Sequence, residues 1–221
     1  MWLPATEVHF VDMLKSSTPV EGKLTYQYHK LAKALKHVKK RRVCLDVGAH
    51  VGLWAMWLVK GFEHVHSFEP VKLHADLYFK NVPGDNFTLH RYALGEKEGQ
   101  IQMQIPAETT GNAHIAIQGR HPGTKHVPNP DDVRTEPAEM RTLDSFGFEN
   151  VDFIKIDVEG YELPMIKGGL QTIKKNKPFI VVEQKKNESA YGGKENEALK
   201  FLCSIGMNIV EPMGGDYLLG W

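Results

Sequence analysis

The 221-residue sequence predicts an α/β protein with a mostly parallel, doubly wound sheet. Residues 42–70, RVCLDVGAHVGLWAMWLVKGFEHVHSFEP, give in order a buried strand, a glycine-bearing turn, an amphipathic helix and a second strand that ends in an acid. Residues 151–167 repeat the succession of an apolar strand and a helix. A chain of this length supports one core, so we expect residues 1–221 to form a single domain.

The turn after the first strand is suited to a ligand. Gly48 and Gly52 permit backbone conformations and close approaches that a Cβ would block, and the next helix directs its N-terminus to the same place. Glu69 ends the second strand, where a carboxylate can accept hydrogen bonds from both hydroxyls of a ribose. Together with the flanking Asp46 and Pro70, these residues predict a nucleoside-binding unit.

Missing motifs narrow the choice of nucleoside. A dinucleotide-binding turn needs glycines at its first, third and sixth positions, which here are Gly48, His50 and Leu53. The sequence also lacks the Gly-Lys-Ser/Thr end of a P-loop. With no seat for a pyrophosphate, we expect an adenosine that carries an amino-acid tail. The alternative is that these residues form an ordinary α/β turn with a capping acid, with only a structural role.

The segments on either side of this unit have recognisable patterns. Residues 1–40 are predicted to form a helical cover, with Val8, Val11 and Leu14 facing the core from a short helix and a longer helix over residues 28–38. After Glu69 we expect the following elements: a helix over 71–80, a strand over 87–93, and a half-exposed strand over 100–105.

Residues 106–138 are rich in proline and glycine, and we expect them to form a lid over the bound acceptor. His114 lies on this lid and is the histidine we expect to meet the acceptor. Ala93 and Leu94, just past the third strand, lie where an adenine would rest.

The second informative stretch is FIKIDVEGYELPMIKGG. Lys155, Asp157 and Glu159 lie at two-residue steps, so they share one side if the strand stays regular. Another strand, over 178–184, ends in Glu183. We expect a helix over 161–167 in between, and the chain closes with a predicted helix over 195–205 and strands over 207–210 and 217–221.

Composition limits the partners and the location. Lys plus Arg and Asp plus Glu are 27 each, so no net field steers the chain to nucleic acid or anionic lipid. Cys44 and Cys203 lie in apolar runs and are predicted to be buried and reduced. With no signal peptide and no apolar run of membrane length, we expect a cytoplasmic protein without a membrane partner. The oligomeric state is not predicted.

The motifs VCLDVGAHVG with SFEP, then TLDSF, then FIKIDVEGYELPMIKGG resemble the FkbM family of class I methyltransferases over residues 40–221. The resemblance implies a Rossmann-like fold with a seven-stranded sheet, helices on both faces and an added hairpin in which one strand is antiparallel. It implies methyl transfer from S-adenosylmethionine, usually to a hydroxyl of a sugar or a polyketide-like acceptor. His50 departs from many class I sequences, which carry glycine there; it is expected to narrow the pocket or touch the methionine tail.

Methyl transfer needs alignment of the acceptor and removal of its proton. Asp157 is our candidate for the general base or for holding the methionine ammonium, with Lys155 as its partner. Glu159 is either a further catalytic acid or a helix N-terminal carboxylate. Asp157, Glu159 and Glu183 are also hard oxygen ligands that suit Mg²⁺, although their spacing does not demand a metal.

Two other functions remain open at this stage. A nucleic-acid methyltransferase is disfavoured by the zero net charge and by the absence of an Asn/Asp-Pro-Pro-aromatic motif. A module that binds S-adenosylmethionine without turnover would have the same binding motifs and no catalysis. The leading hypothesis is an O-methyltransferase of a sugar, a glycan or a related small molecule.

Overall fold

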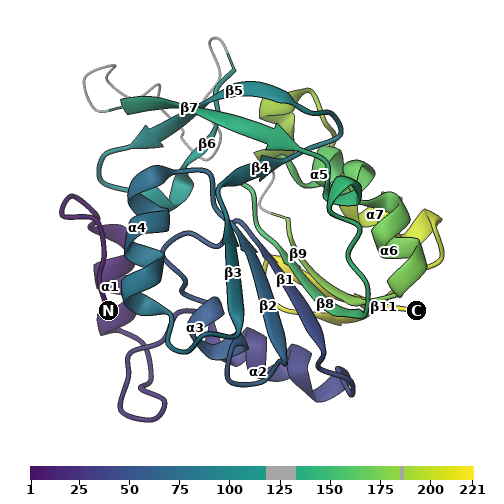
Figure 1. The fold of residues 1–221 in the computed structure, drawn as a ribbon, viewed down its shortest axis with the longest axis horizontal. Helices are drawn as coiled ribbons and strands as arrows, with labels where there is room; N and C mark the ends of the chain where they lie inside the picture. The colour runs from purple at the N-terminus through teal and green to yellow at the C-terminus, as the bar shows by residue number, and fades with distance from the viewer. Residues whose placement is uncertain (118–132, 185–186) are drawn as a thin grey trace.

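The computed structural model describes residues 1–117, 133–184 and 187–221 and has two sheets. A seven-stranded sheet forms the centre of the molecule, and a four-stranded sheet lies across one end of it (Figure 1). The candidate site lies where the two sheets meet.

The large sheet has the order β10-β11-β9-β8-β1-β2-β3. β1 pairs in parallel with β2 and β8, β2 with β3, and β8 with β9, whereas β11 is antiparallel to both of its neighbours. The predicted seven-stranded sheet with one antiparallel strand is therefore confirmed. Its strands are β1 (Val43–Val47), β2 (His64–Phe68), β3 (Phe87–His90), β8 (Val151–Ile156), β9 (Phe179–Glu183), β10 (Asn208–Pro212) and β11 (Asp216–Gly220).

Both faces of this sheet are covered by helices because successive side chains of a strand point to opposite faces. Cys44 belongs to the apolar cluster under α2, α3 and α4, and its neighbour Leu45 to the cluster under α5, α6 and α7. The α-helices are α1 (His9–Lys15), α2 (Tyr28–His37), α3 (Ala55–Leu58), α4 (Lys72–Asn81), α5 (Glu162–Gly168), α6 (Leu170–Asn176) and α7 (Glu197–Ser204).

The small sheet has the order β4-β7-β5-β6. Its strands are β4 (Tyr92–Leu94), β5 (Gly99–Pro106), β6 (His114–Ile115) and β7 (Val133–Arg141), with the 3₁₀ helix η1 (Thr110–Asn112) between β5 and β6. The prediction of one strand over 87–93 was wrong, because the chain leaves the large sheet at Arg91 and β4 pairs with β7 instead. The first part of the predicted lid 106–138 contains η1 and the short strand β6, its last part belongs to β7, and residues 118–132 lie outside the described residues.

Three further expectations need correction. Phe10 and Leu14 are the buried residues of α1, whereas Val8 is exposed. α3 is a single turn rather than a helix from residue 53, and α6 follows α5 with only Gly169 between them. Cys203 is exposed, although Cys44 is buried as predicted. No helix among the described residues is long and apolar enough to cross a bilayer.

The remaining short elements are 3₁₀ helices. They are η3 (Leu143–Phe146) before β8 and η4 (Asn187–Tyr191) after β9. η4 lies against the turn that follows β8, because the backbone of Asn187 packs on Gly160.

Candidate active site

A cavity opens at the carboxyl ends of β1, β2 and β8, beneath the small sheet. This is the edge where parallel α/β sheets bind their ligands. Its walls come from the turns after β1, β2 and β8 and from β4, β5 and β6. Its lining residues are Val47, Gly48, His50, Phe68, Glu69, Pro70, His74, Tyr92, Ala93, Leu94, Met103, Gly111, Ala113, His114, Ile115, Asp157, Val158, Glu159 and Tyr161.

The floor of the cavity is formed by two turns in close contact. Gly48 has φ +75°, and a Cβ there would lie 1.8 Å from the carbonyl oxygen of Asp157. Only glycine allows the turn after β1 to approach the end of β8 this closely. Gly52 was predicted to lie against the same ligand, but it lines neither this cavity nor its neighbour. A Cβ on Gly52 would meet Val82 and Tyr78, so the glycine allows close packing against the end of α4.

Glu69 has the position expected of a ribose ligand. Its Oε2 accepts a hydrogen bond from the backbone N–H of His50 at 2.9 Å, and its Oε1 accepts one from Val71 N–H, also at 2.9 Å. His74 Nδ1 lies 3.3 Å from Oε1. A carboxylate has about four acceptor positions, so two of the bonds of Glu69 hold it in place and it can still accept from a diol.

The far end of the cavity is apolar. Ala93 and Leu94 of β4, predicted to lie beside an adenine, line it, and Met103 of β5 and Ile115 of β6 add further side chains of the small sheet. Tyr161 closes the same end. A flat, apolar ring of the size of adenine suits this end, whereas a charged group would lose its solvation there.

A second, more polar cavity adjoins the first. The two share five lining residues, which form a common wall: Gly48, His50, Gly111, Asp157 and Glu159. The rest of the second cavity is lined by His9, Phe10, Tyr26, Ala49, Leu53, Trp54, Asn112 and Lys155. His9, Phe10 and Tyr26 come from the segment predicted to cover the site.

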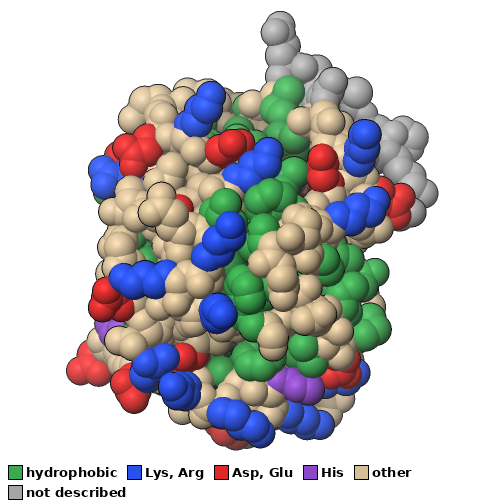
Figure 2. Space-filling view, turned by 90° about the vertical axis from the view of Figure 1, so that its right-hand side faces the viewer, with side chains coloured by type: hydrophobic (Ala, Val, Ile, Leu, Met, Phe, Trp, Pro, Cys, Tyr) green, Lys and Arg blue, Asp and Glu red, His purple; other side chains and the backbone are tan. Residues whose placement is uncertain are grey.

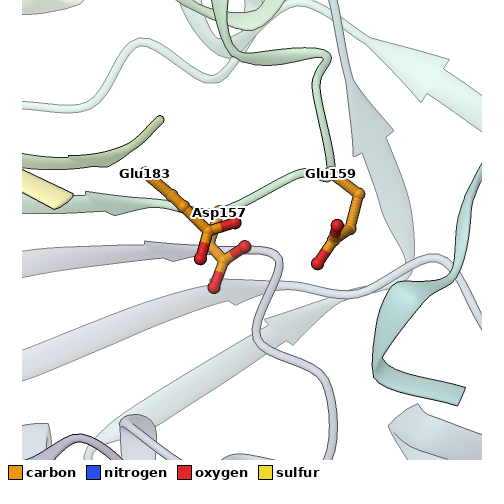
Figure 3. A group of neighbouring side chains, drawn as sticks. All are labelled: Asp157, Glu159 and Glu183. Atoms are coloured by element: carbon orange, nitrogen blue, oxygen red, sulfur yellow. The ribbon is translucent and has the colours of Figure 1, made fainter. Parts of the chain in front are cut away.

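Three carboxylates converge beside the common wall. Asp157, Glu159 and Glu183 each offer an oxygen within 4.8 Å of the other two. Figure 3 shows Asp157 and Glu183 side by side at the ends of β8 and β9, with Glu159 reaching toward them from the turn. Asp157 and Glu183 meet because β8 and β9 are parallel neighbours, but β8 ends at Ile156, so the strand does not stay regular as far as Glu159. Glu159 lies instead in a turn with φ 53° and accepts a hydrogen bond from Asn187 Nδ2 at 2.9 Å.

Lys155 is the cation of this cluster. Its Nζ lies 3.4 Å from Asp157 Oδ2 and 3.8 Å from Asp46 Oδ1, and it donates a hydrogen bond to the carbonyl of Gly48 at 3.0 Å. Burial opposes its charge, but Asp157, Asp46 and Glu183 outweigh burial and raise the pKa of Lys155. A protonated lysine cannot remove a proton, so Lys155 positions and neutralises the acids.

Asp46 acts on the site from below. Asp46 was predicted to contact the cofactor, but it is fully buried and lines neither cavity. Burial raises the pKa of Asp46 to about 6, with Lys155 opposing this shift and Asp157 and Glu69 adding to it. Its contribution is therefore electrostatic, through Lys155.

Glu162 supports the turn that carries Asp157 and Glu159. Its Oε1 accepts hydrogen bonds from Gly160 N–H at 3.0 Å and Val158 N–H at 3.3 Å. Burial raises the pKa of Glu162 to about 8, against the lowering effect of these backbone donors. No pattern in the sequence indicates this role.

His114 is not an exposed lid residue. It is 2% exposed in β6, and its ring nitrogens lie 2.8 Å from the carbonyl oxygen of Asn112 and 3.1 Å from Gln104 Oε1. It lines the first cavity and not the second. We therefore place it in the wall of the apolar cavity, away from an acceptor in the polar one.

Some residues that line the two cavities were not predicted from the sequence. His74 carried a signal, since Val71, His74, Ala75 and Tyr78 are buried at the three- and four-residue spacing of one helix face. Phe10 and Tyr26 carried none, because only the tertiary fold brings them to the turn after β1.

The sheet order, the inserted antiparallel strand and a cavity at the carboxyl ends of β1, β2 and β8 define the class I methyltransferase fold. The family model described as the methyltransferase FkbM domain matches residues 46–208. The chain belongs to the FkbM family of methyltransferases. No curated protein sequence matches it significantly.

Solved structures share this fold at low sequence identity. The FkbM methyltransferase of Methylobacillus flagellatus KT is 20% identical, with a TM-score of 0.50 over 81% of this chain and 43% of that chain. This chain thus spans less than half of that protein's length. An O-methyltransferase from Bacillus cereus in complex with SAH has a TM-score of 0.52 and 13% identity over 95% of this chain and 84% of that chain. The precorrin-6y C5,15-methyltransferase of Geobacter metallireducens GS-15 has a TM-score of 0.51 and 13% identity, covering 94% of both chains.

Proposed function

We propose that the protein transfers a methyl group from S-adenosylmethionine to a hydroxyl of a sugar, a glycan or a related small molecule. The observation that carries this proposal is the common wall of the two cavities, Gly48, His50, Gly111, Asp157 and Glu159. A group can pass directly between two bound molecules only if their sites adjoin. A carboxylate able to accept a proton lies in that wall.

The first cavity suits the cofactor. Glu69 offers carboxylate oxygens to a ribose diol, and Ala93, Leu94 and Met103 offer an apolar surface to an adenine. The amino-acid tail would then lie along the turn Gly48–His50, at the common wall. The similar Bacillus cereus O-methyltransferase was solved in complex with SAH, which supports a cofactor of this class.

The second cavity suits a polyhydroxy acceptor. Phe10, Tyr26 and Trp54 provide aromatic surfaces, and Asn112 and Asp157 provide hydrogen-bonding groups. Such a mixture fits a ring with an apolar face and hydroxyls on its edge. Lys155 balances part of the acidic charge, and the remaining carboxylates can accept hydrogen bonds from the hydroxyls of a neutral acceptor.

S-adenosylmethionine supplies an electrophilic methyl group when bound, and its sulfur needs no protonation on leaving. The chain must therefore align an acceptor oxygen and accept its proton. Lys155 stays protonated and His114 lines only the other cavity, which leaves the two carboxylates of the common wall. We assign the proton to Asp157, because Glu159 is bound by Asn187 Nδ2 at 2.9 Å. Lys155, 3.4 Å from Asp157 Oδ2, orients the carboxylate for this role.

We include a divalent cation in the proposal. Carboxylate oxygens within 4.8 Å of one another can share one ion, because Mg²⁺ and Ca²⁺ bind oxygens at about 2.0–2.6 Å. Asp157, Glu159 and Glu183 carry three formal negative charges, and Lys155 carries one positive charge. These four side chains together have a formal charge of −2, which one divalent cation would neutralise. Such an ion would lower the pKa of an acceptor hydroxyl near Asp157.

The proposal is tested with methyl-labelled S-adenosylmethionine and a panel of sugars, glycans, phenols and RNA. We expect label in a sugar-type hydroxyl. Asp157→Asn should reduce the rate at least about 100-fold, since general base catalysis contributes 10²–10⁴-fold, while binding of S-adenosylhomocysteine persists. Loss of transfer with EDTA and its recovery with Mg²⁺ would support the metal. Transfer by Asp157→Asn at the unchanged rate would contradict the role of Asp157.

The same experiment separates the two alternatives. Label in RNA would indicate a nucleic-acid methyltransferase. The distribution of charged side chains on the visible face does not favour this function. Figure 2 shows Lys and Arg dispersed among Asp, Glu and hydrophobic side chains on one face, rather than gathered into a basic tract. Cofactor binding with no transfer to any acceptor would favour a module that binds without turnover.

A further inference from the structure

A groove that we call the N-terminal groove lies outside both cavities of the site. Residues 1–3, α1, residues 22–24 and the end of α4 line it. Its floor includes the buried side chains of Leu14 in α1 and Met56 in α3. Its rim includes Trp2 and Leu24, which are 60% and 43% exposed. Large apolar side chains gathered around one groove mark a contact surface, whereas single ones scattered over a protein do not.

Trp2 is exposed and yet held in place. Asn81, at the end of α4, binds its backbone on both sides: Oδ1 accepts from the N–H of Trp2 at 2.6 Å, and Nδ2 donates to its carbonyl oxygen at 2.8 Å. The same Nδ2 donates to the carbonyl oxygen of Val51 at 2.9 Å. Lys80 Nζ lies 5.2 Å from the centroid of the Trp2 ring, within the range of a cation–π contact. The fold therefore presents this tryptophan to the solvent at a defined place.

The charged residues that line the groove all have the same sign. They are Lys15, Lys23 and Lys80, and all three are exposed. Asp12 lies 3.9 Å from Lys15, but both side chains are more than 70% exposed, so solvent weakens this pair. Glu21, two residues before Lys23, pairs with Lys60 instead. The charges of the whole chain sum to zero, but those that line this groove do not, and the groove is complementary to an anionic partner.

We propose that the N-terminal groove docks the protein on the surface of an anionic phospholipid bilayer. Trp2 and Leu24 would enter the interfacial layer, and the three lysines would lie among the lipid headgroups. Lysines beside exposed apolar side chains match both parts of such a surface. Tryptophan suits the boundary between them, because its ring is apolar and its N–H can stay hydrated.

The position of the apolar side chains favours a bilayer over an acidic peptide. A peptide helix lays its apolar face into the floor of a groove. Here the floor residues Leu14 and Met56 are already buried, and the exposed apolar side chains are on the rim. The expectation of no membrane partner was based on net charge and on the lack of an apolar run of membrane length, and neither excludes a contact with the bilayer surface.

The N-terminal groove adjoins the cavity proposed for the acceptor. Leu14 and Lys15, at the end of α1, line the groove, whereas His9 and Phe10, at its start, line the second cavity. A helix of seven residues is about 10 Å long. A docked protein would therefore hold its acceptor cavity within about one short helix of the bilayer. This consequence rests on the proposed function, but the docking does not.

The direct test is co-sedimentation of the full chain with vesicles of phosphatidylcholine, with or without phosphatidylglycerol. We expect binding only where phosphatidylglycerol is present. The binding should weaken with added salt, because the Debye length falls from about 10 Å at 0.1 M to about 3 Å at 1 M. Equal binding to both kinds of vesicle, or no binding to the anionic ones at low salt, would overturn the proposal.

Two matched pairs of variants locate the surface. Trp2→Ala should weaken binding to anionic vesicles at least about tenfold, and Lys80→Gln about fivefold, the contribution of one lysine near an anionic surface. Trp221→Ala and Lys177→Gln are the controls. Trp221 is 40% exposed with Lys177 Nζ 5.5 Å from its ring centroid, but it lies at the C-terminus, on the opposite side of the molecule from the N-terminus (Figure 1). The controls should bind as the wild type does, and equal losses in both pairs would contradict docking through the groove.

Brominated lipids show which tryptophan enters the bilayer, because they quench the fluorescence of a ring that contacts the acyl chains. Trp54 and Trp57 are buried, which leaves Trp2 and Trp221 of the four tryptophans exposed. At saturating lipid we expect quenching in the wild type and in Trp221→Ala, and none in Trp2→Ala. Quenching that persists in Trp2→Ala would overturn the proposal.

The remaining outcomes separate the other occupants and the proposed function. A dimer that forms without lipid and is lost in Trp2→Ala, together with no binding to vesicles, would assign the groove to a second copy and overturn the proposal. The vesicle assays need neither the cofactor nor an acceptor. Docking without methyl transfer would therefore contradict only the proposed function, and methyl transfer without docking only this inference.

Discussion

Gly48 is the residue on which the site geometry depends most directly. A methyl group added there meets the carbonyl oxygen of Asp157 at 1.8 Å, a backbone atom that cannot move without displacing the end of β8. Overlap of this size cannot be absorbed by a side-chain rotation. The strain of a positive φ, +75°, comes in addition.

We expect Gly48→Ala to lower the free energy of unfolding by at least about 3 kcal/mol, from left-handed strain and overpacking together. Gly22→Ala is the matched control, because Gly22 has nearly the same φ, +72°, and nothing within 4 Å of the added Cβ. It should cost only about 1–2 kcal/mol. Urea unfolding measures both variants. Equal losses would show that the two turns are free to separate.

Glu162 predicts a pH dependence. Its pKa of about 8 in the folded protein is above the ordinary value of 4.5, so folding favours its protonated form. This contribution to stability is complete below pH 4.5 and is lost as the pH rises through 8. Glu162→Gln keeps an oxygen for Gly160 N–H and Val158 N–H but cannot ionise.

We therefore expect the free energy of unfolding of the wild type to fall, relative to that of Glu162→Gln, between pH 5 and pH 9. Denaturant unfolding at several pH values measures the difference. Glu149→Gln is the control; Glu149 is fully exposed and its partner Lys175 lowers its pKa, so removing its charge should not flatten the profile above pH 5. Parallel profiles for the wild type and Glu162→Gln would mean that Glu162 is ionised in the folded protein.

At the scale of elements, one buried ion pair joins α2 to the antiparallel strand β11. Lys30 Nζ lies 2.9 Å from Asp216 Oδ2, and both side chains are largely buried. Burial raises the pKa of Asp216, and Lys30 opposes the rise. Asp216 of β11 is the register partner of Glu183 in β9. The ion pair is therefore next to one of the three clustered acids.

Lys30→Ala should destabilise the protein by about 3–5 kcal/mol, because it leaves a carboxylate buried without its partner. The double variant Lys30→Met with Asp216→Asn should recover much of this loss. Lys33→Ala is the control on the same helix: Lys33 pairs with Glu211 at 3.0 Å, but the two side chains are 46% and 32% exposed. It should cost less than about 1 kcal/mol. Equal losses in thermal or urea unfolding would mean that the Lys30 pair behaves as a surface pair.

Elements that follow a local pattern were predictable from the sequence. Apolar residues on both faces of β1, β8 and β9 indicate buried strands. The buried residues of α2 and α4 recur at helical spacing, which indicates helices. The small sheet was largely missed. Near its end β7 alternates buried and partly buried residues, such as Ala138 and Glu139, but its pairing with β4 and β5 joins segments that are distant in the sequence.

The candidate site divides in the same way. Glu69, Asp157 and Glu183 were predictable because each follows a recognisable strand, and strands that run in parallel bring their ends together. The contact from Glu7 to Thr110 joins residues 103 positions apart, and no local signal marks either one. The position of Glu159 depends on a positive φ that its residue type does not favour.

For the whole molecule, the first cavity is the place where the two sheets meet, because both of them line it. Gly48 and Glu69 follow strands of the large sheet, while Met103 and Ile115 belong to the small one (Figure 1). A ligand in this cavity is lost whenever either wall opens. Its binding free energy is therefore added to the cost of opening the small sheet.

Hydrogen exchange with and without S-adenosylhomocysteine measures this coupling. At a ligand concentration of 100 times Kd, openings that break the cavity become about 2.7 kcal/mol more costly, so amides of β5 and β6 that exchange through them should slow by about 100-fold. The edge strand β10 is the internal control, since it lies at the far side of the large sheet and lines neither cavity. Its locally exchanging amides should not change. Slowing confined to the turns after β1 and β2 would show that the small sheet takes no part in binding the cofactor.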